Sequence, residues 1–398
     1  MLKFHPAVCA VENNYQIIVT TKSEAFVSIQ IGEEVFIDDS NGILKSKSPT
    51  HKITVPQKLL DEERVYTVIE KPIIKRLPYY TKTREDKLYE YDFRPLKDDN
   101  IRCVHLADAH SNSDGAINAA TKYGKFNFLI FNGDMPEDSG NIKNYDSVYE
   151  TASVLTGGKI PIVFTRGNHD LRGELAEEYV NYFPDRNGKT YYSFRLGKIW
   201  GLCLDCGEDK HDDHEEYGNT IACHQFRLKQ TEYIKQIIEN SKSEYEADGV
   251  EIKLIISHLP FSHRFPEPFD IEEELYTEWC KLIKDNIQPD FMLCGHTHRF
   301  GIYEPGDEYD DYGLPCTMII GSEVLNKYKD FGATGIKFCD DKTIITFIDD
   351  KGNYYIGEFR KGLKHGKGIE YDKNGKGKYE GEFINGKKEG NGKFIYED

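Results

Sequence analysis

Five short apolar runs in this sequence each stop at polar side chains that are able to bind metal. The clearest is 160–165, which is followed directly by Arg-Gly-Asn-His-Asp at 166–170. An apolar run of this length, bounded by turn residues, is typical of a buried β-strand. Ligand sites of open α/β folds lie beyond the carboxyl ends of the strands. We therefore predict an α/β fold whose functional site gathers where these runs end.

The residues that follow the other four runs have a consistent chemistry. Two divalent cations about 3.5–4 Å apart repel each other, so they need a shared carboxylate and several neutral imidazoles. Carboxylate, imidazole and amide donors without a thiolate suit Mn, Fe, Zn or Co equally. The four runs and their following residues are 101–106 with Asp108 and His110, 126–131 with Asp134, 251–256 with His258, and 291–294 with His296 and His298.

The order of these motifs, D-x-H, G-D, G-N-H-D, H and G-H-T-H, resembles that of the calcineurin-like (binuclear) metallophosphoesterases over residues 100–350. The resemblance implies an αββα sandwich, two bound metal ions and hydrolysis of a phosphate ester by a metal-activated water. It also implies the ligand sets: Asp108, His110 and His298 for one metal, Asn168, His258 and His296 for the other, and Asp134 as the bridge between them.

Further roles around the Gly-Asn-His-Asp turn follow from the same resemblance and from local chemistry. His169 is the expected general acid for the leaving oxygen, with Asp170 as its orienting partner. Arg166 and Arg172 bracket the turn, and each is either a bidentate phosphate clamp or a salt bridge to a nearby carboxylate. His263 is a candidate for contact with substrate or for support of the ligands.

The sequence departs from two branches of this family. Purple acid phosphatases place a metal-bound Tyr three residues after the bridging Asp, and here that position is Glu137. Calcineurin-type protein phosphatases carry an Arg just after that Asp, whereas this chain continues Met-Pro-Glu-Asp at 135–138. A loop at 207–217 contains His211 and His214, which we interpret as an acidic solvated loop rather than a third metal site.

Composition limits the partners. The net charge is −17, which argues against a long nucleic acid and leaves a small phosphorylated substrate, because phosphate contacts along a polyanion need a basic stripe. The sequence has no 18-residue apolar stretch, and its nine cysteines are scattered. We therefore expect a cytoplasmic protein with free thiols.

We predict three domains. Residues 1–98 alternate in the manner of β-strands, and the spacing of Leu60 and Tyr66 resembles the tyrosine corner of immunoglobulin-like sandwiches. A fibronectin-III-like β-sandwich is therefore expected there, with a generic β-rich cap as the alternative. The catalytic domain follows at 99–350 after a linker at 95–100, and it closes with a hairpin around Asp340 and Asp341.

Residues 351–398 form the third domain because they repeat with a period of 24. The segment 355–359 recurs at 379–383, and His-Gly-Lys-Gly at 365–368 recurs as Glu-Gly-Asn-Gly at 389–392. This pattern resembles MORN repeats, which are β-hairpins with glycines at tight turns and stacked aromatics. Two units are few for an independent solenoid, so we expect them to dock on the edge of the catalytic sheet. A protein partner or a membrane lipid is the expected ligand, with a structural or protein-binding role favoured.

Two other classes of function stay open. The chain could be a scaffold built on a phosphoesterase fold. It could also be a phosphodiesterase or nuclease rather than a phosphomonoesterase, since both reactions use the same pair of metals.

Overall fold

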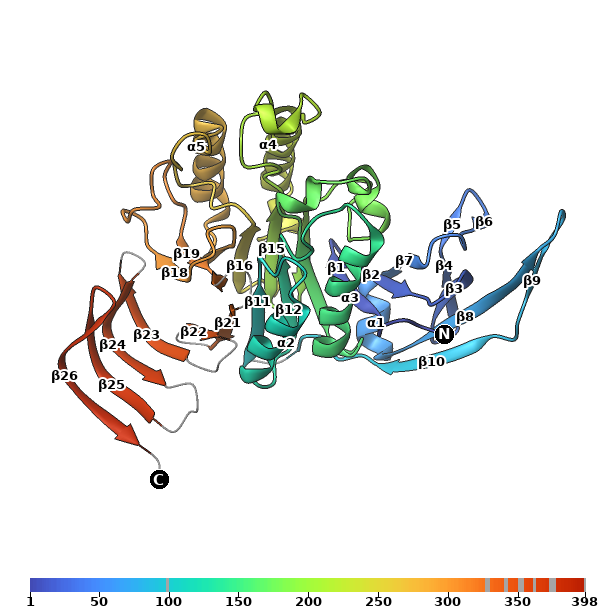
Figure 1. Ribbon diagram of the computed structural model, residues 1–398, viewed down its shortest axis with the longest axis horizontal. Coiled ribbons are helices and arrows are strands. Elements are labelled where there is room, and N and C mark those ends of the chain that lie inside the picture. The colour runs from blue at the N-terminus through green and yellow to red at the C-terminus, as the bar shows by residue number, and fades with distance from the viewer. Residues whose placement is uncertain are drawn as a thin grey trace.

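The fold is taken from a computed structural model that describes residues 1–97, 100–325, 330–339, 343–349, 354–360, 363–371 and 377–396. Two β-sheets pack face to face at its centre, and helices cover both outer faces (Figure 1). The predicted αββα sandwich is therefore confirmed. No helix in these ranges is long and apolar enough to cross a membrane.

The first sheet carries three of the predicted metal-binding strands side by side. Parallel strands β11, β12 and β13 lie between β21 on one side and β1 on the other. Their side chains are buried on both faces, which explains the continuous apolar runs in the sequence. These five strands are β1 (Ala7–Val11), β11 (Ile101–Leu106), β12 (Phe128–Asn132), β13 (Pro161–Thr165) and β21 (Asp330–Phe338).

The second sheet carries the other two predicted strands, β16 and β17, as parallel neighbours. Residues from the two sheets share one core, in which Ile130 and Val163 of the first sheet meet Ile256 of the second. The second sheet runs in the order β14 (Tyr192–Leu196), β15 (Ile199–Leu204), β16 (Ile252–Ser257), β17 (Phe291–Cys294), β19 (Thr317–Ile320) and β18 (Gly301–Tyr303).

The helices use the apolar faces that their periodicity predicts. Tyr145 and Val148 of α3 pack on the first sheet, while Ile234 of α4 and Trp279 of α5 pack on the second. Asn141 caps α3 by accepting from the amide of Lys143. The helices of the two layers are α2 (Ser113–Lys122) with α3 (Ile142–Thr156), and α4 (Cys223–Glu239) with α5 (Glu273–Leu282).

The N-terminal part is divided between two sheets. Strands β1, β2 (Asn14–Thr20) and β7 (Thr50–Pro56) extend the first sheet beyond β13. A separate sheet in the order β10-β8-β3-β4 packs against this extension, and its Ile29 and Val68 share the core that contains Val163. The first sheet therefore includes strands from both sides of the predicted boundary at residue 98, and the division into domains stays a prediction. Fibronectin-III likeness stays a prediction.

The remaining N-terminal elements form this separate sheet or lie beside it. They are β3 (Ala25–Ile31), β4 (Glu34–Ile37), β5 (Asp39–Ser40), β6 (Ile43–Leu44), α1 (Gln57–Glu63), β8 (Val65–Arg76), β9 (Thr81–Thr83) and β10 (Lys87–Asp92).

The tyrosine-corner interpretation of Leu60 and Tyr66 is wrong. Leu60 lies on α1, and the buried hydroxyl of Tyr66 donates to the carbonyl of Gly158 at 2.8 Å. A tyrosine corner bonds to backbone a few residues upstream, whereas this bond joins the N-terminal part to the loop before β13. The spacing in the sequence was the same, but the partner is distant.

The C-terminal repeats dock as predicted. Strand β23 pairs antiparallel with β22, so the hairpins β23–β24 and β25–β26 continue the first sheet at its other end (Figure 1). The expected turn residues Asp340 and Asp341 lie outside the described residues. The strands here are β20 (Glu323–Leu325), β22 (Thr343–Asp349), β23 (Tyr354–Arg360), β24 (Leu363–Tyr371), β25 (Gly377–Ile384) and β26 (Lys387–Tyr396).

The repeated glycines have a different role from the one expected of most of them. Gly386 does occupy a turn, with φ of +81°. Gly381 and Gly392, however, face each other in paired strands, and the Tyr379 hydroxyl lies 2.7 and 2.3 Å from where their Cβ atoms would be. These strand glycines leave room for a tyrosine ring to lie across the sheet.

Candidate metal centre

The predicted ligands all follow the carboxyl ends of strands, and they meet where the two sheets face each other. Those from the first sheet follow β11, β12 and β13, and those from the second follow β16 and β17. Several have left-handed backbone that non-glycine residues rarely adopt, which is common where a functional site over-determines the conformation. Their φ angles are +56° at Asp108, +43° at His110, +51° at Asp134, +68° at His296 and +56° at His298.

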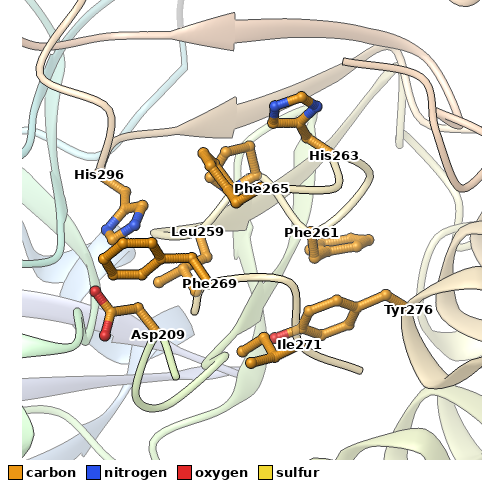
Figure 2. Close-up of a pocket in the computed structure, with 10 residues that line it drawn as sticks. Asp209, Leu259, Phe261, His263, Phe265, Phe269, Ile271, Tyr276 and His296 are labelled. Atoms are coloured by element: carbon orange, nitrogen blue, oxygen red, sulfur yellow. The ribbon is translucent and has the colours of Figure 1, made fainter. Parts of the chain in front are cut away.

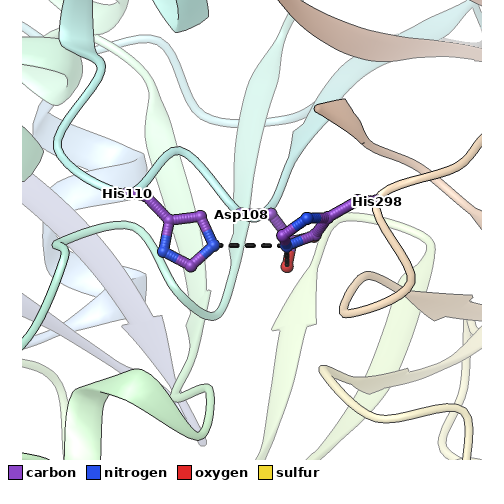
Figure 3. Close-up of side chains that lie close together, drawn as sticks. All are labelled: Asp108, His110 and His298. Atoms are coloured by element: carbon purple, nitrogen blue, oxygen red, sulfur yellow. Dashed lines mark hydrogen bonds and ion pairs between the residues drawn. The ribbon is translucent and has the colours of Figure 1, made fainter. Parts of the chain in front are cut away.

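One group of metal-capable atoms consists of Asp108, His110 and His298 (Figure 3). The Nε2 atoms of the two imidazoles are 3.3 Å apart, and Nε2 of His298 is also 3.3 Å from Oδ1 of Asp108. Three donors from β11 and β17 thus point at a common centre. This is the set that the sequence predicts for one metal.

A second group consists of Asp134, His258 and His296. Nε2 of His258 is 3.2 Å from Oδ2 of Asp134 and 3.6 Å from Oδ1 of Asp108. The side-chain amide of Asn168 lies 3.1 Å from Nδ1 of His296. The structure therefore brings together every residue predicted for the second metal, and His258 lies between the carboxylates of the two groups.

Burial and charge shift the pKa values of these groups. Burial lowers the pKa of His110 and of His296 to about 4, so both imidazoles are neutral at pH 7. Burial raises the pKa of Asp108, but His258 and His298 oppose it and hold that pKa at about 2. The Asp134 carboxyl also has a lowered pKa, because His258 outweighs its burial.

His258 shows where a cation fits. Its burial alone would lower its pKa, yet the Asp134 and Asp108 carboxylates raise it to about 10. The two carboxylates around this ring thus favour positive charge, which a divalent cation held by the same atoms would supply. The donor set therefore fits bound metal cations.

Residues that the sequence analysis missed hold the ligands in place. Nδ1 of His258 donates to the Asn132 carbonyl at 2.7 Å, which directs Nε2 toward the carboxylates. The Asn132 amide contacts the carbonyls of Ser257 and Leu293 at 3.2 and 3.0 Å, so β12 is joined to β16 and β17. Asn132 directly precedes the G-D motif, and this position in the sequence could have identified it as a site residue. Ser322, which donates to Asp108, also follows an apolar strand and a glycine, β19 and Gly321.

His169 lies at the edge of the centre, at the start of the 3-10 turn η1 (His169–Leu171). Its ring is edge-on to that of His110 at 4.6 Å, and its Nδ1 donates to the Glu137 carbonyl at 3.0 Å. The Glu137 carboxylate also lies 3.7 Å from Nδ1 of His110, so His110, Glu137 and His169 form a third metal-capable group. Glu137 was not predicted as a ligand.

Asp170 has a different role from the predicted one. It was expected to orient His169, but its carboxylate accepts from the amides of Gly167 at 2.7 Å and Asp134 at 3.1 Å. Burial and the nearby Asp134 raise the pKa of Asp170 to about 7. Asp170 therefore shapes the backbone that presents Asp134, and the Glu137 carbonyl orients His169.

Both flanking arginines form salt bridges, but Arg172 also contacts a predicted catalytic residue. Nε of Arg166 donates to Asp205 at 2.6 Å in a buried salt bridge. Arg172 donates to both carboxylate oxygens of Glu208, at 2.9 and 2.7 Å, and its Nη1 lies 3.2 Å from Nε2 of His169. Arg166 is thus a structural residue, whereas Arg172 contacts the candidate general acid.

An aromatic pocket adjoins the centre. Figure 2 shows Phe269 and Asp209 beside the imidazole of His296. Phe265 is edge-on to His296 at 5.7 Å, and it also contacts the ring of His263 at 4.7 Å. His263 donates to Asp311 at 2.7 Å. His263 therefore lines the same pocket as the predicted metal ligand His296, and its role toward substrate stays a prediction.

The acidic loop supports the site without forming a metal-capable group of its own. Glu208 and Asp209 are buried and receive Arg172 and the Tyr217 hydroxyl. Across the described ranges, the metal-capable groups do not include His211 or His214.

Comparison with known proteins places this centre in a family. A family model described as calcineurin-like phosphoesterase matches residues 101–300, and the MORN repeat model matches 355–377 and 379–398. A purple acid phosphatase, PPD1 from yellow lupin (Lupinus luteus) seeds, has a similar fold with a TM-score of 0.55 and 12% identity, over 87% of this chain and 72% of that one.

Relatives in sequence cover part of the chain. The serine/threonine-protein phosphatase CPPED1 of Homo sapiens is 21% identical over 189 residues, which are 42% of this chain and 55% of that protein. The probable cyclic nucleotide phosphodiesterase RPA0124 of Rhodopseudomonas palustris is 28% identical over 176 residues, 43% of this chain and 57% of that protein. This chain thus spans a little over half the length of these relatives. With half of its residues matched by the family model and both ligand groups assembled, the chain belongs to the calcineurin-like phosphoesterase family.

Proposed function

We propose that this protein hydrolyses phosphate esters with two metal ions bound at the centre formed by Asp108 and Asp134. The observation that carries the proposal is the convergence of two complete ligand groups, each with one buried carboxylate and two imidazoles. Mn, Fe, Zn and Co suit these oxygen and nitrogen donors. Bound there, the metals would supply Lewis acidity and activate a water molecule for attack on phosphorus.

The proposed ligand assignment follows the two groups. Asp108, His110 and His298 hold one ion, and Asn168, His258 and His296 hold the other. Asp134 is the proposed bridge, as the family resemblance implies, and its Oδ2 lies 3.2 Å from Nε2 of His258 in the second group. The neutral imidazoles of His110 and His296 are ready to bind without first losing a proton.

His169 is the proposed general acid. With its Nδ1 proton donated to the Glu137 carbonyl, its Nε2 accepts from Arg172 in the geometry described above. To deliver a proton, Nε2 must be protonated, and the Arg172 guanidinium must then turn to another acceptor. A phosphate oxygen is such an acceptor. Arg172 would therefore bind the phosphoryl group and leave Nε2 of His169 to protonate the leaving oxygen.

The proposed substrate is a small phosphorylated molecule or side chain. The net charge of −17 and the acidic loop support this over a long nucleic acid. The names of the relatives include a protein phosphatase and a cyclic nucleotide phosphodiesterase, so both monoesters and diesters are carried forward. All nine cysteines are unpaired in the described chain, which supports the cytoplasm as its location. A protein partner is proposed for the MORN repeats.

The test is hydrolysis of p-nitrophenyl phosphate and bis-p-nitrophenyl phosphate by purified protein supplied with Mn²⁺, Fe²⁺ or Zn²⁺. We expect metal-dependent turnover of at least one ester, and the ratio of the two rates assigns the substrate class. Asp134→Asn should lose bound metal and turnover together. Asp213→Asn, the same change at an exposed loop residue, is the matched control and should retain both.

His169→Asn sharpens the mechanism. It should keep its metal and lose about 10²–10⁴ in rate, with a larger loss for alkyl esters than for p-nitrophenyl esters, whose leaving group needs less protonation. If Asp134→Asn retains both metals and full turnover, the ligand assignment is wrong. If neither ester is cleaved with any of the three metals, the scaffold alternative replaces the enzyme.

A further inference from the structure

A β-hairpin projects from the N-terminal sheet, far from the metal centre. Strands β8 and β9 form this arm at the opposite end of the molecule from the repeats β23–β26 (Figure 1). We define the arm as residues 71–88. Its tip is the turn Leu77-Pro78-Tyr79-Tyr80, closed by a 2.9 Å hydrogen bond from the amide of Leu77 to the carbonyl of Tyr80. Pro78 fits the second position of such a turn, so the tip has a defined shape.

The tip exposes two large side chains that are adjacent in the sequence. Tyr79 is 98% exposed and Tyr80 is 65% exposed. Ile74 on β8 is 51% exposed, and Leu88 on β10, which pairs with Ile69 at the base of the arm, is 67% exposed. Single exposed apolar residues are common, but two adjacent ones on a protruding tip mark a contact surface.

The charge of the arm is opposite to that of the rest of the chain. Residues 71–84 contain no Asp or Glu, and Glu85 and Asp86 are the acidic residues of the arm, in a chain with a net charge of −17. Arg76, directly before the tip, pairs with Glu24 at 2.9 Å, and Lys71, at the base, pairs with Asp86 at 3.4 Å. Lys75 and Lys82 are opposite each other in the hairpin. The basic residues of this segment are Lys71, Lys75, Arg76, Lys82 and Arg84.

These features fit an anionic lipid surface better than other anionic partners. Tyr side chains favour the water–lipid interface because an apolar ring carries a polar hydroxyl. Lys and Arg set back from such a tip meet the headgroup phosphates. Ile74 and Leu88 add aliphatic surface, which does not stack on nucleic acid bases. A protruding tip also lets an otherwise acidic protein approach an acidic surface with a basic region.

We propose that this arm is a membrane-docking element that inserts Tyr79 and Tyr80 among anionic lipid headgroups. The arm would orient the protein with its N-terminal sheet toward the bilayer. Binding would need both parts of the arm, the apolar tip and the basic flanks, because either contribution alone is weak. This docking is independent of catalysis, so it can be tested without a substrate.

The test is co-flotation of the full-length protein with vesicles of phosphatidylcholine alone or of phosphatidylcholine with phosphatidylserine. We expect retention on the mixed vesicles, little on phosphatidylcholine, and release by salt. Lys82→Gln and Arg84→Gln should each weaken binding about fivefold. The double variant Tyr79→Ser, Tyr80→Ser should abolish retention at the same protein concentration. These side chains are exposed, so unchanged circular dichroism and esterase activity would show that the fold is intact.

A matched control separates the arm from the repeats. Lys387→Gln with Lys393→Gln removes two exposed charges from β26 and should leave vesicle binding unchanged. The proposal is overturned if the arm variants float like the unaltered protein, or if the control loses binding instead. It is also overturned if the unaltered protein does not float with the mixed vesicles. In that case, an arm-dependent dimer in size-exclusion chromatography with light scattering would assign the tip to a second copy of the chain, and arm-dependent RNA retention would assign it to nucleic acid.

Discussion

The two ends of the first sheet are extended in different ways. At one end, β1, β2 and β7 are covered by the separate N-terminal sheet β10-β8-β3-β4, and their buried side chains belong to the core of the catalytic sandwich. At the other end, β23–β26 join through the pairing of β22 with β23, and Tyr355, Tyr379 and Phe383 form a small core of their own. Strand β26 is exposed along nearly its whole length.

Hydrogen-bond pairing alone therefore does not decide whether a strand unfolds together with its neighbours. Both extensions continue the same ladder, but only burial of shared apolar surface makes two regions unfold together. We expect the N-terminal extension to be part of the unit that holds the metals. The repeats should open separately and at lower free energy.

The largest expected effect comes from removing the ends. Deleting residues 1–97 should give insoluble or unfolded protein, because β13, which precedes Asn168, would lose its neighbour β1 and the core that covers it. Deleting 352–398 is the matched control and should leave metal content and turnover of a chromogenic ester unchanged. Circular dichroism and metal analysis of both truncations check the prediction. A folded, metal-loaded 1–97 deletion would reverse the comparison, and an inactive but metal-loaded 352–398 deletion would mean that the repeats help build the site.

Single core substitutions should show the same contrast at smaller scale. Tyr15→Ala, at a fully buried ring of β2, should lower the global free energy of unfolding by about 3–5 kcal/mol. Phe383→Ala, at an equally buried ring of β25, should leave the main unfolding transition in place and loosen the repeats alone. Urea unfolding followed with hydrogen exchange of β25 and β26 distinguishes the two. Equal shifts in the main transition would show that the repeats belong to the central unit.

The bond between Tyr66 and Gly158 tests the junction itself. Tyr66→Phe leaves the Gly158 carbonyl without its buried donor and should destabilise the whole central unit by about 1–3 kcal/mol. Tyr89→Phe removes a hydroxyl that donates to Glu70 within the N-terminal part, and it serves as the matched control. A biphasic melt for Tyr66→Phe alone would show that this bond couples the two parts. A global loss as large in the control would assign the effect to hydroxyl removal in general.

The smallest expected effect concerns acid and the repeats. Burial raises the pKa of Glu370, but Lys364 and Lys388 outweigh it, so that pKa lies below its usual range. A lowered pKa gives stability above the unfolded-state pKa of about 4.5, and that stability is lost as pH falls through the folded-state value. Glu370→Gln should therefore weaken the repeats by about 0.2–1 kcal/mol at pH 7 and by progressively less below pH 4.5. Hydrogen exchange of β24 at pH 7 and at a pH below 4.5 measures the difference between Glu370→Gln and the unaltered protein. A pH-independent difference would argue against the ion pairs.

The metal centre was predictable from the sequence because its signal is local. Each ligand directly follows an apolar run, and the rules for α/β sheets bring the ends of such runs together. The supporting residues were harder to find. Ser322 follows the apolar strand β19 but carries a hydroxyl that is not a typical metal ligand, Glu137 lies three residues after Asp134 on the same loop, and the role of Asp170 depends on which of two neighbours its carboxylate faces.

The pairing of strands that lie far apart in the sequence could not be predicted either. Alternation predicted strands in the first 98 residues, but it does not say which strand lies beside which. The pairing of β1 with β13 therefore had no counterpart in the sequence pattern. The edge docking of the repeats could be predicted, because two short units have too little apolar surface to stand alone.

Asn132 joins the two sheets and one of the predicted metal ligands. Its amide joins β12 to the backbone of β16 and β17, and its carbonyl accepts from His258. The position of this ligand is thus fixed by bonds within the protein as well as by any metal that it holds. A substitution at Asn132 should therefore disturb two sheets and one ligand together.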